Sequence, residues 1–252
     1  MVKRIMQILL AGSIVFALSA CGNASTAETG TSMSSGAEVN EEKETSTNDV
    51  SAETETKTSD VTSSEGNPSE AGKILITYFS VMETDGVDTV GGASRVAVDG
   101  EVMGNNEYVA KLIQQETGGD LFSIETVQDY PTIHEPLLEF AYNEKAKNAR
   151  PELATKIEKL DQYDTIFLGY PNWNADLPMP LYTFLESYDF SGKTIIPFTT
   201  HGGSGFSSTV NTIGDLQPGA TILKDGLSIS RNSVSGAKNQ VSQWVQGLGL
   251  AK

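Results

Sequence analysis

The sequence predicts an α/β fold: a three-layer, doubly wound sandwich on a five-stranded parallel sheet. Three observations predict it. Short apolar runs rich in β-forming residues recur along residues 73–252, as expected of strands that are buried on both faces. Stretches with helical spacing separate these runs. Strands that alternate with helices favour right-handed crossovers, and hence a parallel sheet with helices on both sides.

The expected strands and helices alternate along the chain. The predicted strands are residues 73–80, 120–126, 164–170, 193–202 and 220–229. The predicted helices are residues 106–119, 136–149, 151–164, 178–189, 205–216 and 237–250. The Gly118–Gly119 pair is expected to end the first helix, and Pro151 to divide the second from the third. In the last helix, Trp244 shares a face with Val241 and Val245, which indicates a core position.

The N-terminal segment is expected to be a targeting signal. Lys3 and Arg4 precede an apolar run, and Leu-Ser-Ala-Cys places the single cysteine, Cys21, after small residues. This pattern resembles a bacterial lipoprotein signal, in which residues 1–20 are removed and Cys21 is lipidated. A transmembrane anchor is the alternative, although the apolar run is short for a span of about 20 residues. With one cysteine, neither an intrachain disulfide nor a thiolate metal site is expected.

Residues 21–72 are expected to form a disordered acidic tether. From residue 22 onward the segment consists mainly of Ser, Thr, Glu and Ala, with eleven acidic residues and two lysines. So few large apolar side chains cannot offset the chain entropy that ordering would cost. The alternative is a cryptic binding segment, but the tether has no aromatic anchors.

A single acidic domain, residues 73–252, is expected to follow the tether. The whole chain has a formal charge of −16, of which the signal contributes +2 and the tether −9. The formal charge of the domain is therefore −9. An acidic domain argues against binding to nucleic acid and against adsorption to anionic lipid. The expected location is the outer face of a bacterial cytoplasmic membrane, with membrane contact only through the lipid on Cys21.

Three loops are the candidate binding site, because ligands of doubly wound sheets bind at the carboxyl ends of the strands. The first loop has Ser80 at the end of a strand and, after a gap, Gly104, Asn105 and Asn106 at the start of a helix. This arrangement suits one phosphate monoester, and a plain helix cap is the alternative. The loop contains neither a Walker motif nor a G-x-G-x-x-G motif.

The other two loops offer an aromatic wall and a glycine-rich edge. The residues after the third strand are Pro171, Asn172, Trp173 and Asn174. Those at the end of the fourth strand and after it are Thr200, His201, Gly202, Gly203 and Ser204. The indole can lie against a planar ring, and the glycines let backbone N–H groups approach a ligand. Together with the phosphate loop, these residues predict a pocket for flavin mononucleotide (FMN).

The domain resembles the flavodoxin family over essentially its whole length. The resemblance rests on the segments ILITYFS, GNNEYVAKLI, TGGDLFSI, FLGYPNW with DLPMPLYTFLESYDFSGK, and IPFTTHGGSGFSST. It implies that Ser80 and residues 104–106 hold the phosphate, that residues 171–174 flank the isoalloxazine ring, and that residues 200–204 meet its pyrimidine edge. The position of FMN is taken from the family, since flavodoxin is itself an example of the rule for such sheets.

Two departures from the family pattern are visible. Residues 81–103 separate Ser80 from Gly104, whereas the family has a contiguous phosphate loop that ends in Gly-Asn-Thr, and Asn106 stands in place of the threonine. The family often has Trp-Trp where this chain has Trp173 and then asparagine. One aromatic wall is therefore absent, and the flavin is expected to be more exposed on that side.

Two functions of different classes remain open. One is an FMN-dependent oxidoreductase that passes electrons from NAD(P)H to a quinone or small acceptor, which the exposed flavin favours. The other is an FMN electron carrier that exchanges electrons with a redox protein, which the lack of a second nucleotide motif favours. A binding module without flavin is a third alternative. The acidic domain, with Asp176 near the pocket, would lower the reduction potential of a flavin.

His201 is the candidate catalytic residue, as a hydrogen-bond donor or proton relay. A cap of its own loop is the alternative. His134 is expected to begin a helix rather than to meet a substrate. HGGSG superficially resembles an esterase segment, but Phe206 replaces the last glycine of G-x-S-x-G and no histidine follows His201. Two distant histidines and no H-E-x-x-H motif predict no metal site.

Overall fold

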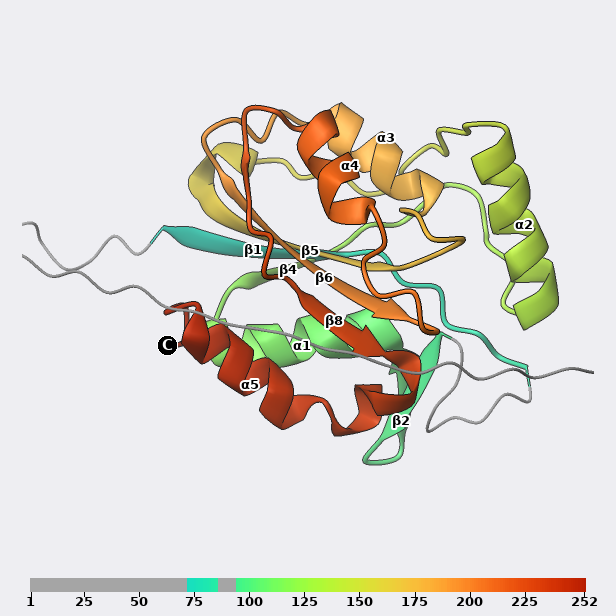
Figure 1. Cartoon of the computed structure of the whole chain (residues 1–252), viewed down its shortest axis with the longest axis horizontal. Coiled ribbons are helices and arrows are strands. Elements are labelled where there is room, and N and C mark those ends of the chain that lie inside the picture. Colours follow the sequence, from blue (N-terminus) through green and yellow to red (C-terminus); the bar gives the residue numbers. More distant parts are fainter. Residues whose placement is uncertain (1–71, 86–93) are drawn as a thin grey trace, which may run out of the picture. The chain divides into compact units, whose positions relative to one another are not determined.

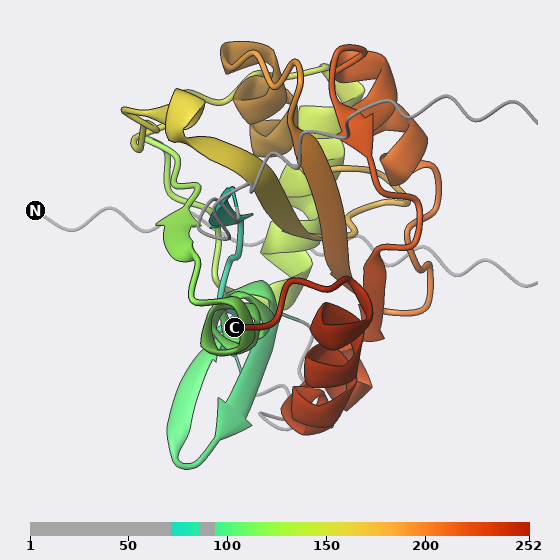
Figure 2. The same ribbon diagram turned by 90° about the vertical axis from the view of Figure 1, so that its left-hand side faces the viewer.

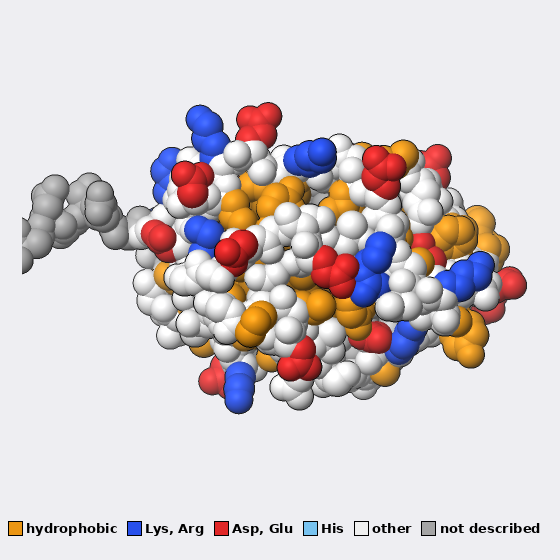
Figure 3. All heavy atoms as spheres, turned by 90° about the horizontal axis from the view of Figure 1, so that it is seen from above, with side chains coloured by type: hydrophobic (Ala, Val, Ile, Leu, Met, Phe, Trp, Pro, Cys, Tyr) orange, Lys and Arg blue, Asp and Glu red, His pale blue; other side chains and the backbone are white. Residues whose placement is uncertain are grey.

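A computed structural model of the chain describes residues 72–85 and 94–252 (Figure 1). The predicted signal peptide, Cys21 and the tether up to residue 71 lie outside these ranges. Within the described ranges, none of the helices is both long and apolar enough to cross a membrane. Acidic and basic side chains are interspersed over the face that carries α3 (Met179–Ser187) and α4 (Thr209–Leu216) (Figure 3).

The central sheet is parallel and doubly wound. Its strands are β1 (Lys73–Tyr78), β4 (Asp120–Ser123), β5 (Tyr163–Pro171), β6 (Thr194–His201), β7 (Thr221–Ile222) and β8 (Leu227–Ser230). They lie in the order β4-β1-β5-β6-β7, and β8 also pairs with β6. The next strand in the parallel sheet after β1, which is β4, lies on one side of β1, and the later strands lie on the other side. The direction in which strands are added therefore reverses at β1, as in other doubly wound sheets. The predicted fold class is confirmed.

Helices cover both faces of this sheet (Figure 1). One face carries α1 (Asn105–Thr117) and α5 (Lys238–Gly247), and the other carries α3 and α4. The helix α2 (His134–Ala146) lies beyond the carboxyl ends of the strands. Alternate residues of β5 enter the two cores: Ile166 and Leu168 belong to one hydrophobic cluster and Phe167 to the other. The strands are therefore apolar on both faces, as a sheet between two helix layers requires.

Trp244 is partly buried and packs against the core, in agreement with the predicted core position. Its ring packs edge-on against Phe167, with the centroids 5.6 Å apart. Its Nε1–H donates to the carbonyl of Asp225 at 3.2 Å. Val241 and Val245, on the same face of α5, are fully buried. The indole thus closes the outer side of the core between α5 and the sheet.

The helix predicted for residues 151–164 is wrong, because this segment is irregular apart from a short 3-10 turn at Leu160–Gln162 and the start of β5 at Tyr163. It runs antiparallel to residues 125–127, with an isolated bridge between Thr126 and Leu153. Leu153 and Ile157 still pack against the core, but from an irregular segment. Their spacing of four residues imitates a helix face, and the backbone bonds to the neighbouring segment override that preference.

The predicted fifth strand, residues 220–229, is two short strands. Both β7 and β8 pair with β6, at Thr194–Ile195 and at Phe198–His201 respectively. Pro197 lies between these two paired stretches and has no N–H to donate to a ladder. The interruption of the strand therefore coincides with the proline in its partner.

The insertion between β1 and α1 contains a β-hairpin that the sequence analysis does not predict. Strands β2 (Arg95–Val98) and β3 (Glu101–Gly104) pair in antiparallel fashion. Asp99 and Gly100 join them, both at positive φ (53° and 85°), as a two-residue hairpin turn requires. Figure 2 shows the hairpin projecting past α1. It delivers the chain to Gly104, where α1 begins.

Candidate functional site

A pocket of about 460 Å³ lies at the carboxyl end of the sheet. The predicted residues that line it are Pro171, Asn172, Trp173, Asn174, Thr200, His201, Gly202, Gly203 and Ser204. A crevice too narrow for a water molecule adjoins this pocket, with Ser94, Pro171 and Thr200 in both walls. The predicted residues Ser80, Asn105 and Asn106 line the crevice. The structure therefore brings the three loops together at one edge.

The crevice contains buried amide groups that lack partners. Asn105 and Asn106 are each 1 % exposed. Asn106 Nδ2 donates to Thr200 Oγ1 at 3.0 Å, whereas Asn105 Oδ1, Asn105 Nδ2 and Asn106 Oδ1 bond to none of the described residues. A buried polar group without a partner costs about 1–3 kcal/mol, so such groups mark places where a ligand is expected.

Gly104 allows α1 to start close to β1. A Cβ at this position would lie 2.1 Å from Ser80 Oγ, so any other residue would push the serine hydroxyl out of the crevice. The backbone N–H of Asn105 donates to the carbonyl of Ser94 at 3.3 Å, which ties the helix start to the insertion. The two halves of the predicted phosphate loop therefore meet despite the residues that separate them.

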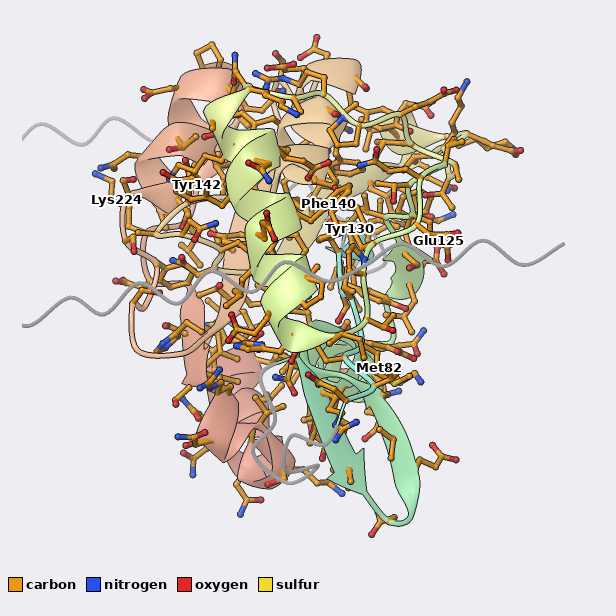
Figure 4. The ribbon with its side chains drawn as sticks, turned by 90° about the vertical axis from the view of Figure 1, so that its right-hand side faces the viewer. Met82, Glu125, Tyr130, Phe140, Tyr142 and Lys224 are labelled. Atoms are coloured by element: carbon orange, nitrogen blue, oxygen red, sulfur yellow. The ribbon has the colours of Figure 1, made fainter. Side chains whose placement is uncertain are left out.

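Trp173 is more buried than a tryptophan in a polar loop suggests. It is 9 % exposed. Its ring centroid lies 5.5 Å from that of Phe79, edge-on, and 5.7 Å from that of Tyr130. Phe140 of α2 packs on Tyr130 in turn, and Figure 4 shows these two rings side by side. The indole therefore presents only part of its surface to the pocket.

A tight turn holds Trp173 in this position. The backbone groups of Trp173 and Asp176 exchange two hydrogen bonds, of 3.1 and 3.0 Å. The two residues between them, Asn174 and Ala175, have positive φ (53° and 59°). Positive φ suits asparagine but costs an alanine about 1 kcal/mol. This strained pair turns the chain back at the rim of the pocket.

Asp176 anchors the turn next to the pocket, although it is not among the residues that line it. Its Oδ1 accepts from the backbone N–H of Leu177 at 2.8 Å and from the Tyr182 hydroxyl at 2.9 Å. Lys145 of α2 lies 3.1 Å from its Oδ2 and compensates its charge. Burial, followed by the bond to Asp176, raises the pKa of Tyr182 to about 12, so this hydroxyl remains a donor.

His201 is held by its own loop. Its Nδ1 accepts the backbone N–H of Gly203 at 2.9 Å, and Gly203 has a φ of 142°, which favours glycine. Because Nδ1 is the acceptor, the proton of the neutral ring lies on Nε2. Burial lowers the pKa of His201, which favours the neutral ring. His201 is thus both a cap of the loop and a donor available to a ligand.

The lowered pKa of His201 predicts a pH-dependent stability. The unfolded chain takes up the proton more readily, so acidification below the ordinary value of 6.5 favours unfolding, and the penalty vanishes above it. On acidification from about pH 7.5 to about pH 5, the free energy of unfolding is therefore expected to fall less in the His201→Asn variant than in the wild type. Urea unfolding at both pH values measures this. An equal loss in both proteins would contradict a depressed pKa.

Several pocket residues were not predicted from the sequence. They are Glu83, Ser94, His134, Leu137, Leu138, Ala175 and Arg231. Arg231 starts the 3-10 helix η2 (Arg231–Gly236) directly after β8. It therefore follows the fifth strand, and the rule that selected the other loops could have found it. For Glu83 and His134 no comparable sequence signal exists, because the insertion brings them together.

Comparison with known proteins identifies the family. A family model described as Flavodoxin matches residues 73–248. The chain belongs to the flavodoxin family. The predicted family is confirmed, and family membership supports FMN as the predicted cofactor. No curated protein matches the chain.

Two solved structures show the same fold for this flavodoxin-family chain. A protein of Bacteroides uniformis ATCC 8492, assigned as a flavoprotein, has 28% sequence identity and a TM-score of 0.54, over 69% of this chain and 98% of its own. A second, from Bacteroides eggerthii DSM 20697 and assigned in the same way, has 23% identity and a TM-score of 0.52, over 71% and 98%. Both cover the described domain and support its architecture.

Proposed function

We propose that the protein is an FMN-dependent oxidoreductase that passes electrons from NAD(P)H to a quinone or a small acceptor. The observation that carries the proposal is the 460 Å³ pocket, which adjoins a crevice with buried, unpartnered amides. This volume lies within the usual range for small-molecule sites, about 300–1,000 Å³. Bound FMN would supply the electron-transfer chemistry, and the protein supplies binding, orientation and electrostatics.

The pocket offers matching groups to both ends of FMN. Asn105 and Ser80 are the donors for the phosphate, with Asn106 once its bond to Thr200 is displaced. In the larger pocket, Asn172 Oδ1 is buried without a partner among the described residues, and it can accept from a ring N–H. Its Nδ2 donates to the carbonyl of Gly205 at 2.8 Å, which fixes the amide orientation.

The remaining pocket residues favour an enzyme over a carrier. Glu83, His134 and Arg231 are not among the residues predicted to hold FMN, but they line the same pocket. Arg231 forms no ion pair with any residue in the described ranges, so its charge is available to an anionic nucleotide or acceptor. A site that only holds FMN does not need these groups.

An FMN electron carrier is the second candidate. It is supported by the absence of a second nucleotide-binding motif in the sequence and by the net charge of −9 on the domain, which suits electrostatic docking on a redox protein.

Steady-state oxidation of NADPH and NADH by the FMN-loaded protein, with and without a soluble quinone, separates the two candidates. Free FMN at the same concentration is the control. Turnover without any protein partner is the expected result. If the flavin stays bound and neither nucleotide is oxidised, the reductase proposal fails and the carrier is favoured.

For location, we propose a lipid anchor at Cys21 and a domain outside the cytoplasmic membrane. The Leu-Ser-Ala-Cys sequence after an apolar run supports this proposal. Cys21→Ser is expected to move the protein from the membrane fraction to the soluble fraction of the producing bacterium. An unchanged membrane fraction would exclude lipidation as the anchor.

A further inference from the structure

A histidine–carboxylate pair, which is not among the residues predicted to hold FMN, lines the pocket. Glu83 belongs to the segment after β1, and His134 is the first residue of α2. The two residues are 51 positions apart in the chain, and His134 Nδ1 lies 2.7 Å from Glu83 Oε1. The structure thus joins two parts of the chain at an ionisable pair beside the proposed flavin site.

The carboxylate of this pair is held in a fixed place. Glu83 is 1 % exposed. Arg95 Nη1 donates to the backbone carbonyl of Glu83 at 3.2 Å, and Asp85 Oδ2 accepts the backbone N–H of His134 at 2.9 Å. Glu83 Oε2 bonds to none of the described residues. A buried carboxylate is costly unless it is paired, and the imidazole of His134 is one group that pairs with it.

The ring of His134 is not needed to start the helix. Its backbone N–H is already bonded to Asp85, and the residue before it, Ile133, provides no side-chain cap. A helix cap therefore explains the position of Asp85 but not the pair formed by the His134 ring and Glu83. The side chain of His134 is 26% exposed, whereas that of Glu83 is 1% exposed, so the ring is the accessible member.

The pair determines which ring nitrogen can react. Glu83 Oε1 accepts a hydrogen bond from Nδ1–H, so Nε2 is the nitrogen available to a molecule in the pocket. For Nε2 to donate a proton, the ring must carry a proton on both nitrogens, with Nδ1–H still bonded to Glu83. Among the residues that the structure describes, the other charged or titratable groups at the pair or in the pocket wall are Asp85, Arg95, His201 and Arg231.

We propose that His134 donates a proton to the electron acceptor and that Glu83 is its positioning residue. This inference rests on the proposed reductase function and assigns the acceptor to the quinones or similar carbonyl compounds. A quinone becomes a hydroquinone by gaining two electrons and two protons. Bound FMN in its reduced form would provide the hydride, which is two electrons and one proton, and the role of His134 would be to supply the second proton from Nε2–H. The neutral ring then regains a proton from solvent.

The test compares acceptors that do and do not need protons. His134→Gln is expected to slow quinone reduction by about 100-fold, because general acid catalysis contributes about 10²–10⁴-fold. Glu83→Gln is expected to slow it by about 10-fold, as loss of an orienting partner does. Ferricyanide accepts one electron and no proton, so its reduction is expected to stay at the wild-type rate in both variants. FMN affinity is expected to be unchanged.

A matched control is Glu186→Gln, which removes a carboxylate that is paired with Arg150 at 2.7 Å outside the pocket. This substitution should change the reduction rate of neither quinone nor ferricyanide. Equal slowing of quinone and ferricyanide in the His134 variant would overturn the inference, and so would wild-type rates with both acceptors. If the wild type reduces neither acceptor, the proposed function itself fails. If His134→Gln does not fold, the rates of quinone and ferricyanide reduction are compared in Glu83→Gln instead.

A second measurement needs no flavin. Nitrogen-15 NMR of the FMN-free protein reports which ring nitrogen carries the proton in the neutral form. The structure predicts Nδ1–H for His134, which faces Glu83, and Nε2–H for His201, which accepts from Gly203. An Nε2–H tautomer for His134 would contradict the pairing on which the inference depends.

Discussion

Replacing Asn105 with leucine is expected to stabilise the FMN-free protein and to weaken FMN binding at the same time. Both polar atoms of this side chain are buried and lack a partner in the described structure. Their removal should raise the free energy of unfolding by about 1–3 kcal/mol, the usual cost of an unsatisfied buried group. Leucine has a similar shape, and the backbone bond from residue 105 to Ser94 does not depend on the side chain.

The same substitution removes a hydrogen bond to the phosphate. Hydrogen bonds to charged groups contribute about 1.5–3 kcal/mol, so the dissociation constant of FMN should rise by about 10- to 100-fold. Urea unfolding of the FMN-free protein and titration with FMN measure the two effects. Asn211→Leu, at an exposed position in α4, is the control and should change neither. If Asn105→Leu binds FMN like the wild type, the crevice is not the phosphate site.

Trp173→Ala is expected to lower the free energy of unfolding by about 3–5 kcal/mol, as truncation of a buried tryptophan does. The side chain is 9 % exposed and packs against Phe79 and Tyr130. Its loss leaves a cavity beneath the turn that forms the pocket rim. The substitution should therefore also weaken FMN binding by the folded protein. Titration with FMN under conditions in which the variant remains folded measures this effect separately from the loss of stability.

Trp244→Ala is the matched control for this prediction. Trp244 packs on Phe167 in the other hydrophobic cluster and does not line the pocket. It should destabilise the fold while the folded protein keeps its FMN affinity. Trp173→Phe should retain much of both properties, because an aromatic ring remains beside Phe79. Equal FMN affinities in the Trp173→Ala and Trp244→Ala variants would exclude Trp173 from the cofactor site.

The sequence predicts most of the fold because its strands are buried on both faces. A run such as residues 73–78 has no polar face and is followed by a polar loop. The sequence therefore indicates both that the run is a strand and about where the strand ends. The incorrect secondary-structure predictions lie in segments whose conformation is set by tertiary contacts. Residues 151–159 have a helix-like spacing, but residues 152–154 bond to residues 125–127 instead. The Asp99–Gly100 dipeptide is a local hairpin signal, although no hairpin is predicted for this segment above.

The sequence also predicts which loops form the site, since the carboxyl ends of parallel strands meet at one edge. It does not predict what the insertion contributes. Glu83 and His134 meet only because the chain after β1 returns to the start of α2, where Thr84 and Thr132 also bond. The burial of Trp173 likewise depends on Tyr130, from a separate loop. Such contacts between loops have no periodic pattern in the sequence.

The most direct test of the account is a titration of the FMN-free protein with FMN and with riboflavin, followed by flavin fluorescence. The pocket and crevice predict saturable binding of one FMN per chain. They also predict markedly weaker binding of riboflavin, which has the ring but not the phosphate. Absence of saturable FMN binding, or equal affinity for the two flavins, would contradict the claim that the three loops form one FMN site.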